Sequence, residues 1–239
     1  MSPTDGTQVE SSSPPKSTLR EYFESICVAV ILALFIRTFV IQAFKIPTGS
    51  MIDNLLIGDH LLVNKMVYSP TAGDVEKELL PVKDIRRGDV IVFKYPSEPE
   101  RDFIKRVIGL PGDAIRIEEK TVYVNGEPLQ EDYVYYPPGG KEEEGYSDYR
   151  RDNMPEMIVP PNQYFVMGDN RDNSHDSRFW GTLPRDLVKG RALIIYWSFE
   201  APGEAYLATS MVDRIKGWAW MVVNFYDKTR KDRFFRLVR

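Results

Sequence analysis

The hydrophobic and polar positions divide the chain into one long apolar segment near the N-terminus and a longer region of short runs. Residues 26–44 read ICVAVILALFIRTFVIQAF, and a helix from residue 23 to 45 would be about 33 Å long, which matches the hydrocarbon thickness of a bilayer. Arg37 interrupts the run; its side chain either reaches the nearer membrane interface, which is favoured, or faces a partner. Because no small-residue cleavage site follows, the pattern predicts an uncleaved transmembrane anchor at residues 21–45.

Short alternating or fully apolar runs dominate the chain after this segment. Glycine–aspartate pairs begin at Gly58, Gly88 and Gly112, and each precedes such a run: HLLVNKMV, VIVFKYP and AIRIEEKTVYVNG. The runs DFIKRVIGL, QYFVMGD and RALIIYWSF have the same character. Turns that lead into short runs of this kind are typical of strands, and the pattern shows no long helical period between residues 61 and 199. We therefore predict a mainly β fold, a folded-over antiparallel sheet or an irregular barrel.

Shifts in composition predict five regions. Residues 1–20 are rich in Ser, Pro and Thr and should form a disordered tail before the anchor. Residues 46–126 and 162–200 contain the strand-like runs and should form the β domain. Residues 127–161 are rich in Pro, Gly, Tyr and charge, which indicates an inserted cap or small lobe. Residues 201–239 contain the apolar run WAWMVVNFY; it is too short to span a bilayer and should lie on the core or at the membrane interface.

Charge and residue counts exclude several functions. The chain has 31 basic and 35 acidic side chains with both signs interspersed, and without a basic stripe we do not expect nucleic acid as a partner. The single cysteine, Cys27, lies in the apolar segment and can form no intrachain disulfide. The two histidines, His60 and His175, are too few for a zinc site built from several histidines. We expect neither a metal nor another cofactor.

A serine a few residues past the apolar segment has the most informative placement in the chain. Ser50 lies in KIPTGSM, where Pro47 and Gly49 predict a tight polar turn. A serine at such a turn can present its hydroxyl and its backbone N–H to the same carbonyl, as acyl transfer requires. The competing interpretation is that Ser50 is an ordinary turn residue.

A polar loop, GDNRDNSHDSRFWG at Gly168–Gly181, follows one of the apolar runs. Three interpretations compete: a calcium loop, although the spacing misses the EF-hand pattern; a solvated turn; or a rigid loop that orients a catalytic group through Ser174 and is held by Asp176 and Arg178. His175 lies directly between Ser174 and Asp176. Such neighbours cannot easily converge, so a Ser-His-Asp triad is disfavoured.

Lysine is the next candidate for a catalytic base. In DFIKRVIGL, Lys105 would share one face of a strand with Phe103 and Val107. Desolvation by these neighbours would lower the pKa of Lys105 and leave the amine neutral. Lys65 has an equally good pattern, and either lysine could instead be an ordinary strand residue with its head group in water.

Four segments occur in one order along the chain: IPTGSM; GDHLLVNKMVYS; RGDVIVFKYP with FIKRVIGLPGD; and MGDNRDNSHDSRFWG. In this order and spacing they resemble the bacterial type I signal peptidases (leader peptidases), a family of membrane-anchored Ser–Lys proteases. The resemblance runs from about residue 20 to about residue 199, and the C-terminal DRFFRLVR also resembles endings seen in the family. It implies a mostly antiparallel β fold, in agreement with the strand pattern.

The resemblance also implies roles for single residues. Ser50 would be the nucleophile, and Lys105, rather than Lys65, would be the general base. Thr48 stands where the family often has a serine, and its hydroxyl would join the Ser50 N–H in the oxyanion hole.

Residues of the polar loop would support the lysine: Ser174 through a hydrogen bond, and Asp176 and Arg178 by holding the loop. One departure lies beside the nucleophile. Where the family commonly has Pro-Thr-Leu, this chain has Asp53-Asn54-Leu55. The proline's fixed φ is lost, although Asp and Asn can form a hydrogen-bonded turn in its place.

The resemblance implies that the substrates are signal peptides of secretory preproteins, with small side chains at the first and third positions before the cut. It places the chain in the bacterial cytoplasmic (inner) membrane as a single-pass protein in contact with the lipid bilayer. The N-terminal tail would be cytoplasmic and the catalytic domain extracytoplasmic; the flanking basic residues do not settle this orientation. Two alternatives remain. Self-cleaving repressors share the dyad but carry a DNA-binding domain, and a membrane-tethered, non-enzymatic β adaptor would need no Ser–Lys pair.

Overall fold

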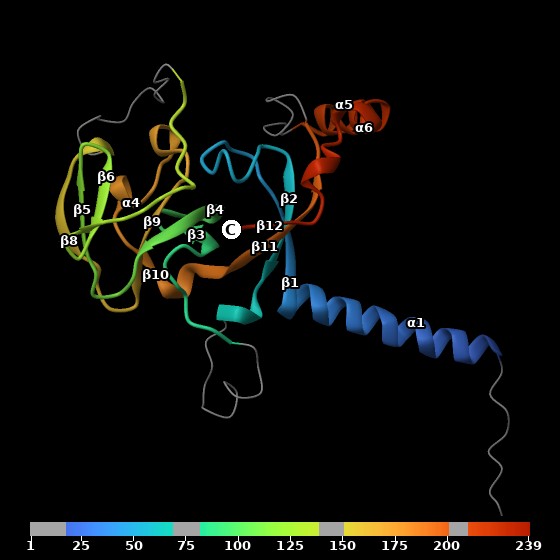
Figure 1. Ribbon diagram of the computed structural model, residues 1–239. Coiled ribbons are helices and arrows are strands. Elements are labelled where there is room, and N and C mark those ends of the chain that lie inside the picture. The colour runs from blue at the N-terminus through green and yellow to red at the C-terminus, as the bar shows by residue number, and fades with distance from the viewer. Residues whose placement is uncertain (1–17, 69–81, 139–150, 201–209) are drawn as a thin grey trace, which may run out of the picture. The chain divides into compact units, whose positions relative to one another are not determined.

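The computed structural model describes residues 18–68, 82–138, 151–200 and 210–239 (Figure 1). The chain separates into two compact units, Met1–Thr38 and Phe39–Arg239. The second unit is mainly antiparallel β, as the sequence pattern predicts. The expected disordered tail lies almost entirely outside the described residues.

The N-terminal apolar segment forms helix α1 (Thr18–Phe35), which continues into a π-helical turn, η1 (Ile36–Val40). Together they form a helix of 23 residues with a mean hydropathy of 2.2, which is long and apolar enough to cross a membrane. The helix is shorter than the anchor expected at residues 21–45, because the last five of these residues form strand β1 (Ile41–Lys45). Pairing with β2 (Asp59–Asn64) provides β1 with backbone partners that a helix end would lack.

Two antiparallel sheets make up the second unit. The larger sheet has eight strands in the order β1-β2-β11-β3-β4-β9-β10, with β12 paired to β11. The smaller sheet has four strands in the order β7-β6-β5-β8, and β5, β6 and β8 lie side by side in Figure 1. The remaining strands are β3 (Val90–Tyr95), β4 (Glu98–Gly109), β5 (Ala114–Glu118), β6 (Thr121–Val124), β7 (Glu127–Pro128), β8 (Met154–Ile158), β9 (Gln163–Met167), β10 (Leu183–Pro184), β11 (Val188–Ser198) and β12 (Arg236–Leu237).

Short helical segments lie between or after the strands. They are η2 (Met66–Tyr68), η3 (Arg171–Asn173), α4 (Ser177–Trp180), η4 (Arg185–Leu187), α5 (Met211–Val223), α6 (Phe225–Lys228) and η6 (Lys231–Arg233). Between residues 61 and 199 none of the described helices exceeds one turn, because the apolar positions there alternate and bury strand faces.

The three glycine–aspartate turns begin strands as predicted. Gly58, Gly88 and Gly112 have φ angles of 92°, 89° and 89°. Glycine adopts this left-handed conformation without a steric penalty. Strands β2, β3 and β5 begin one or two residues later.

The second lobe is larger than the insertion expected at residues 127–161. Within that range β7 and β8 pair with β6 and β5, so the small sheet begins at Ala114, inside the range assigned to the β domain. Alternate residues of β5 and β6 pack with β8 and β9 into one apolar cluster: Ile108, Ile115, Ile117, Val122, Val124, Val159, Phe165 and Met167. Residues 139–150 of the expected insertion lie outside the described residues.

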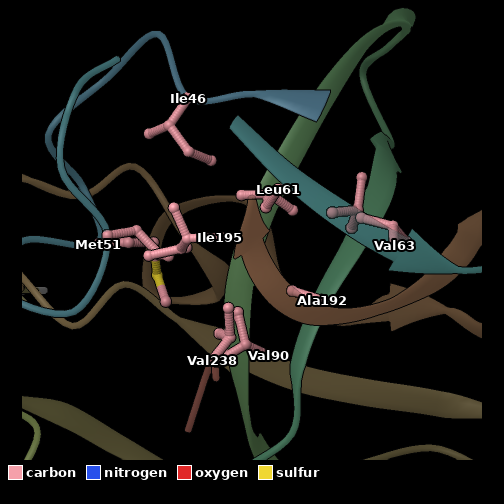
Figure 2. Packing of buried hydrophobic residues seen from close by; sticks show 10 residues of the cluster. Ile46, Met51, Leu61, Val63, Val90, Ala192, Ile195 and Val238 are labelled. Carbon is pink, nitrogen blue, oxygen red and sulfur yellow. The ribbon is translucent and has the colours of Figure 1, made fainter. Parts of the chain in front are cut away.

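A second apolar cluster lies directly behind the turn that contains Ser50. Met51 and Leu55 of this turn are fully buried, and Val238 from the C-terminal end of the chain joins them. Figure 2 shows Met51 and Val238 converging on Ile195 of β11 and Val90 of β3. Burying each such side chain stabilises the fold by about 1.5–3 kcal/mol. The nucleophile candidate is therefore next to a packed core residue.

The C-terminal segment packs on the large sheet. Strand β12 pairs with β11, Val238 is 7% exposed, and Arg233 is buried. Residues 201–239 were expected either on the core or at the membrane interface, and the last of them pack on the core. Helix α5 exposes Ile215, Val222 and Val223.

Candidate active site

Ser50 and Lys105 meet in the interior of the β unit. Lys105 lies on β4, 55 residues from Ser50, and its Nζ is 2.6 Å from the Ser50 Oγ. Ser50 is 8% exposed and Lys105 is 4% exposed. A buried hydroxyl that contacts a buried amine is the geometry in which an amine can remove the hydroxyl proton.

Core packing and a neighbouring asparagine hold the backbone around Ser50. The Asn170 N–H donates to the Ser50 carbonyl and the Asn170 Nδ2 donates to the Gly49 carbonyl, both at 3.1 Å. On the other side, Met51 is anchored in the core and its carbonyl accepts from the Leu55 N–H at 2.8 Å. Asn170 was not singled out from the sequence, because nothing in the pattern distinguishes it from the other polar residues of its loop.

Strand β4 determines the environment of Lys105. The register places Lys105 opposite Ile91 of β3, and its Nζ lies 5.7 Å from the centre of the Phe103 ring. This burial agrees with the desolvation expected from the alternating pattern. Lys65 lies past the end of β2 and is half-buried. Of the two candidate bases, the structure brings Lys105 to Ser50.

Asp176 is the centre of the polar loop. It is fully buried and accepts hydrogen bonds from the Ser174 Oγ at 2.8 Å, the Gly168 N–H at 3.0 Å and the Arg178 guanidinium, whose Nε is 2.8 Å away. Burial alone would raise the pKa of Asp176, but the charge and hydrogen bonds of Arg178 and the hydrogen bond from the Gly168 amide outweigh it and lower the pKa. The carboxylate therefore stays ionised and fixes the Ser174 hydroxyl.

The other carboxylates of the loop are also paired with cations. Asp169 binds Arg106 at 2.6 Å, and Asp172 binds Lys120 at 2.9 Å. Arg178 additionally donates to the Arg171 carbonyl at 2.8 Å. These contacts favour the rigid-loop interpretation over a solvated turn. Among the described residues, no group of three His, Cys, Asp or Glu side chains could hold a metal ion.

Thr48 is exposed and lies two residues before Ser50, in the loop after β1. Its distance along the chain allows the hydroxyl to approach a substrate bound at Ser50. The oxyanion role of Thr48 and of the Ser50 N–H stays a prediction.

Both histidines have partners other than the Ser–Lys pair. The His60 ring packs on Trp197, with ring centroids 4.6 Å apart, and burial lowers its pKa. The His175 Nε2 is 3.2 Å from the Tyr95 hydroxyl. These contacts place the rings in aromatic surroundings.

We expect a double variant, His60→Gln with His175→Ala, to keep most of its activity, because the proposed proton transfer uses Lys105. Cleavage rate and far-UV circular dichroism should be measured together. A loss of several orders of magnitude in rate with an intact fold would restore a histidine mechanism.

Gly168 allows the polar loop to approach Ser50 closely. A Cβ at this position would lie 2.3 Å from the Ser174 Oγ and 2.5 Å from the Ser50 carbonyl oxygen, closer than such atoms pack. We expect Gly168→Ala to lower kcat at least about a hundred-fold, because a displacement near 1 Å has this effect in active sites. Gly217→Ala in helix α5 is the control, because a Cβ there has open space and the backbone is helical. Full activity of Gly168→Ala would show that the loop does not position the reacting groups.

Comparison with known proteins identifies the class of protein. The family described as signal peptidase, peptidase S26 matches residues 19–197. The signal peptidase I of Pseudomonas aeruginosa is 39% identical over 211 residues, covering 77% of this chain and 74% of the relative. The signal peptidase I of Aquifex aeolicus is 35% identical over 233 residues, covering 77% and 86%. A solved structure, a signal peptidase I from Enterococcus faecalis, has 32% identity and a TM-score of 0.36, covering 46% of this chain and 97% of that one.

The chain therefore belongs to the signal peptidase family S26. Within the family it is an enzyme of the signal peptidase I type, which confirms the resemblance seen in the sequence motifs.

Proposed function

We propose that the protein is a serine endopeptidase that removes N-terminal signal peptides from exported proteins at the membrane surface, through a Ser50–Lys105 dyad. The observation that carries this proposal is the buried 2.6 Å contact between the Ser50 Oγ and the Lys105 Nζ. The turn after β1 and strand β4, which are distant in sequence, bring these groups together. An ordinary turn serine would not require contact with a buried amine.

In the proposed first step, the Ser50 Oγ attacks the scissile carbonyl carbon while neutral Lys105 takes its proton. The negative oxygen of the tetrahedral intermediate receives hydrogen bonds from the Ser50 N–H and the Thr48 hydroxyl. When the C–N bond breaks, Lys105 gives the proton to the leaving amine. An ester then joins Ser50 to the signal peptide.

In the second step, Lys105 removes a proton from water and the resulting hydroxide attacks the ester carbon. Lys105 returns a proton to the Ser50 oxygen as the C–O bond breaks, which frees the signal peptide and regenerates the enzyme. Ser174 holds the lysine in place, and the buried Asp176–Arg178 pair fixes Ser174.

Substrate binding is proposed at the open edge of the large sheet. Strand β1 is the terminal strand in the sheet order and leads directly to Ser50. An extended peptide can add to such an edge, with shallow apolar pockets for small side chains. The Thr18–Val40 helix would anchor the enzyme as a single span in the bacterial cytoplasmic membrane, with the β unit outside, so that enzyme and substrate share one surface at a raised effective concentration.

The alternative of a non-enzymatic β adaptor is less well supported, because it gives no reason to bury a lysine against a serine. The test is to incubate the detergent-solubilised full chain with a secretory precursor and to map the cut by mass spectrometry. We expect one cut after a residue pattern with small side chains at the first and third positions. A matched precursor with leucine at the first position should stay uncut. An uncut first precursor, or equal cutting of both, would contradict the proposal.

A further inference from the structure

Three residues of the C-terminal segment, Arg233, Val238 and Arg239, contact the turn that carries Ser50. These contacts are called the brace. We propose that Arg233 of this segment is a positioning residue for the nucleophile, which it holds in register with Lys105 by fixing the turn from Ser50 to Asp59. The inference rests on the proposed role of Ser50. It adds a function for a part of the chain that lies almost 200 residues from the serine.

Arg233 links Asn54 to Asp59, the last residue of this turn. Its Nε donates to the Asp59 Oδ1 at 3.0 Å and its Nη2 donates to the Asp59 Oδ2 at 2.6 Å. The same Nη2 also donates to the Asn54 carbonyl at 2.8 Å. Arg233 is 4% exposed and Asp59 is fully buried. One guanidinium thus binds a carboxylate at the start of β2 and a backbone oxygen four residues after Ser50.

The carboxylate to which Arg233 binds is itself fixed. The Asp59 Oδ1 accepts from the Ser198 Oγ at 2.6 Å, and the Asp59 Oδ2 accepts from the Leu56 N–H at 2.8 Å. Backbone bonds from the Ile46 N–H to the Asp59 carbonyl, 2.8 Å, and from the Gly58 N–H to the Ile46 carbonyl, 3.0 Å, close the loop at its base. Asp59 is therefore a fixed point to which Arg233 connects the Asn54 side of the turn.

Packing transmits this constraint to Ser50. Met51 and Leu55, on either side of Asn54, lie in the core with Val238 of the same C-terminal segment. Figure 2 shows Met51 in this cluster beside the sheet. The Asn54 carbonyl and the Leu55 N–H belong to one peptide group, and this N–H donates to the Met51 carbonyl at 2.8 Å. A shift of the Asn54 carbonyl would therefore disturb Met51, which is covalently bonded to Ser50.

A second contact joins the turn to the C-terminal segment through the side chain of Asn54. The Asn54 Nδ2 donates to the main-chain oxygen of Arg239, which also accepts from the Arg106 Nη2 at 2.9 Å. Arg106 binds Asp169, and the next residue, Asn170, donates its backbone N–H to the Ser50 carbonyl. The Asn54 side chain thus links the turn to the C-terminal segment and to the polar loop.

The brace requires the planar fork of arginine. A lysine at position 233 would keep the positive charge beside Asp59, so the buried carboxylate would stay paired. A single ammonium cannot reproduce the two parallel bonds to the carboxylate together with the bond to the Asn54 carbonyl. Arg233→Lys therefore separates positioning from simple charge compensation.

The test compares Arg233→Lys with Arg87→Lys in the full chain with its membrane segment, in detergent. Arg87 makes the same kinds of contact, to the Asp113 carboxylate at 3.1 Å and to the Ile108 carbonyl at 2.5 Å, and neither contact involves the Ser50 turn. Well below the melting temperature of each variant, we expect Arg233→Lys to lower kcat at least about ten-fold with KM within about two-fold. Arg87→Lys should keep kcat within about two-fold.

Unchanged kcat in a folded Arg233→Lys enzyme, or equal losses in both variants, would overturn the inference. If Arg233→Lys does not fold, Asn54→Ala tests the same brace from the other side, because it removes the Asn54 side-chain hydrogen bonds to the Arg239 main-chain oxygen and to Asp169 and keeps the backbone carbonyl that Arg233 binds. It should lower kcat at least about three-fold, and unchanged kcat there would overturn the inference as well. A wild-type enzyme that does not cleave the precursor would instead refute the proposed function, so the two failures are distinguishable.

Discussion

Replacing Ser50 by alanine is expected to abolish cleavage of a signal-peptide precursor while the protein still folds. Removing the nucleophile of a serine protease lowers kcat by about a million-fold. The alanine deletes one oxygen at a site that is 8% exposed, so the core around Met51 stays packed. The lost hydrogen bond to Lys105 should cost about 1 kcal/mol of the free energy of unfolding. Precursor cleavage followed by gel electrophoresis, together with circular dichroism, measures both effects.

Ser97→Ala is the control for this variant, because Ser97 is exposed in the turn between β3 and β4. It should process the precursor at the wild-type rate. Near-normal turnover by Ser50→Ala would refute the dyad mechanism. If both variants kept their biological function and neither cleaved the precursor, the non-enzymatic adaptor would be favoured.

Local patterns in the sequence were sufficient to predict most elements of the fold. An apolar run without alternation predicted the N-terminal helix, and glycine–aspartate pairs such as those at Gly58 and Gly88 predicted where strands begin. Both glycines have positive φ angles in the structure. Both signals depend on residues that are close in sequence. The order of the strands depends on pairings between distant segments, such as β2 with β11, and alternation in one strand carries no information about its neighbour.

The same limit explains what was missed around the candidate site. Lys105 and Lys65 have equivalent local patterns, and only the position of β4 between β3 and β9 brings one of them to Ser50. Without the family resemblance, the two lysines could not have been separated. Asn170 binds the Gly49 carbonyl, and Arg233 binds the Asn54 carbonyl in addition to the Asp59 carboxylate. Every residue carries a backbone carbonyl, so such an acceptor leaves no trace in the sequence. The expected helix end differs from the observed one, at Val40, because the apolar residues Ile41, Ala43 and Phe44 are compatible with either a helix or a strand.

Replacing Lys105 by arginine is expected to inactivate the enzyme, although size and positive charge are nearly conserved. The proposed step needs a neutral amine that accepts the Ser50 proton, and a guanidinium stays protonated at any pH at which the protein is folded. Burial of Lys105, which is 4% exposed, disfavours its ammonium form. We therefore expect the wild-type kcat/KM to rise from neutral to alkaline pH as the lysine proton leaves, and Lys105→Arg to be inactive throughout the profile.

Lys65→Arg is the matched control, since Lys65 is half-buried past the end of β2 and has the same local sequence pattern. Its pH profile should coincide with that of the wild type, because an arginine there leaves the contact between Lys105 and Ser50 untouched. Melting curves of both variants separate loss of the base from loss of the fold. An active Lys105→Arg enzyme with an inactive Lys65→Arg enzyme would transfer the role of base to Lys65. A wild-type kcat/KM that falls with rising pH would contradict a neutral lysine as the base, because deprotonation would then remove the active form instead of creating it.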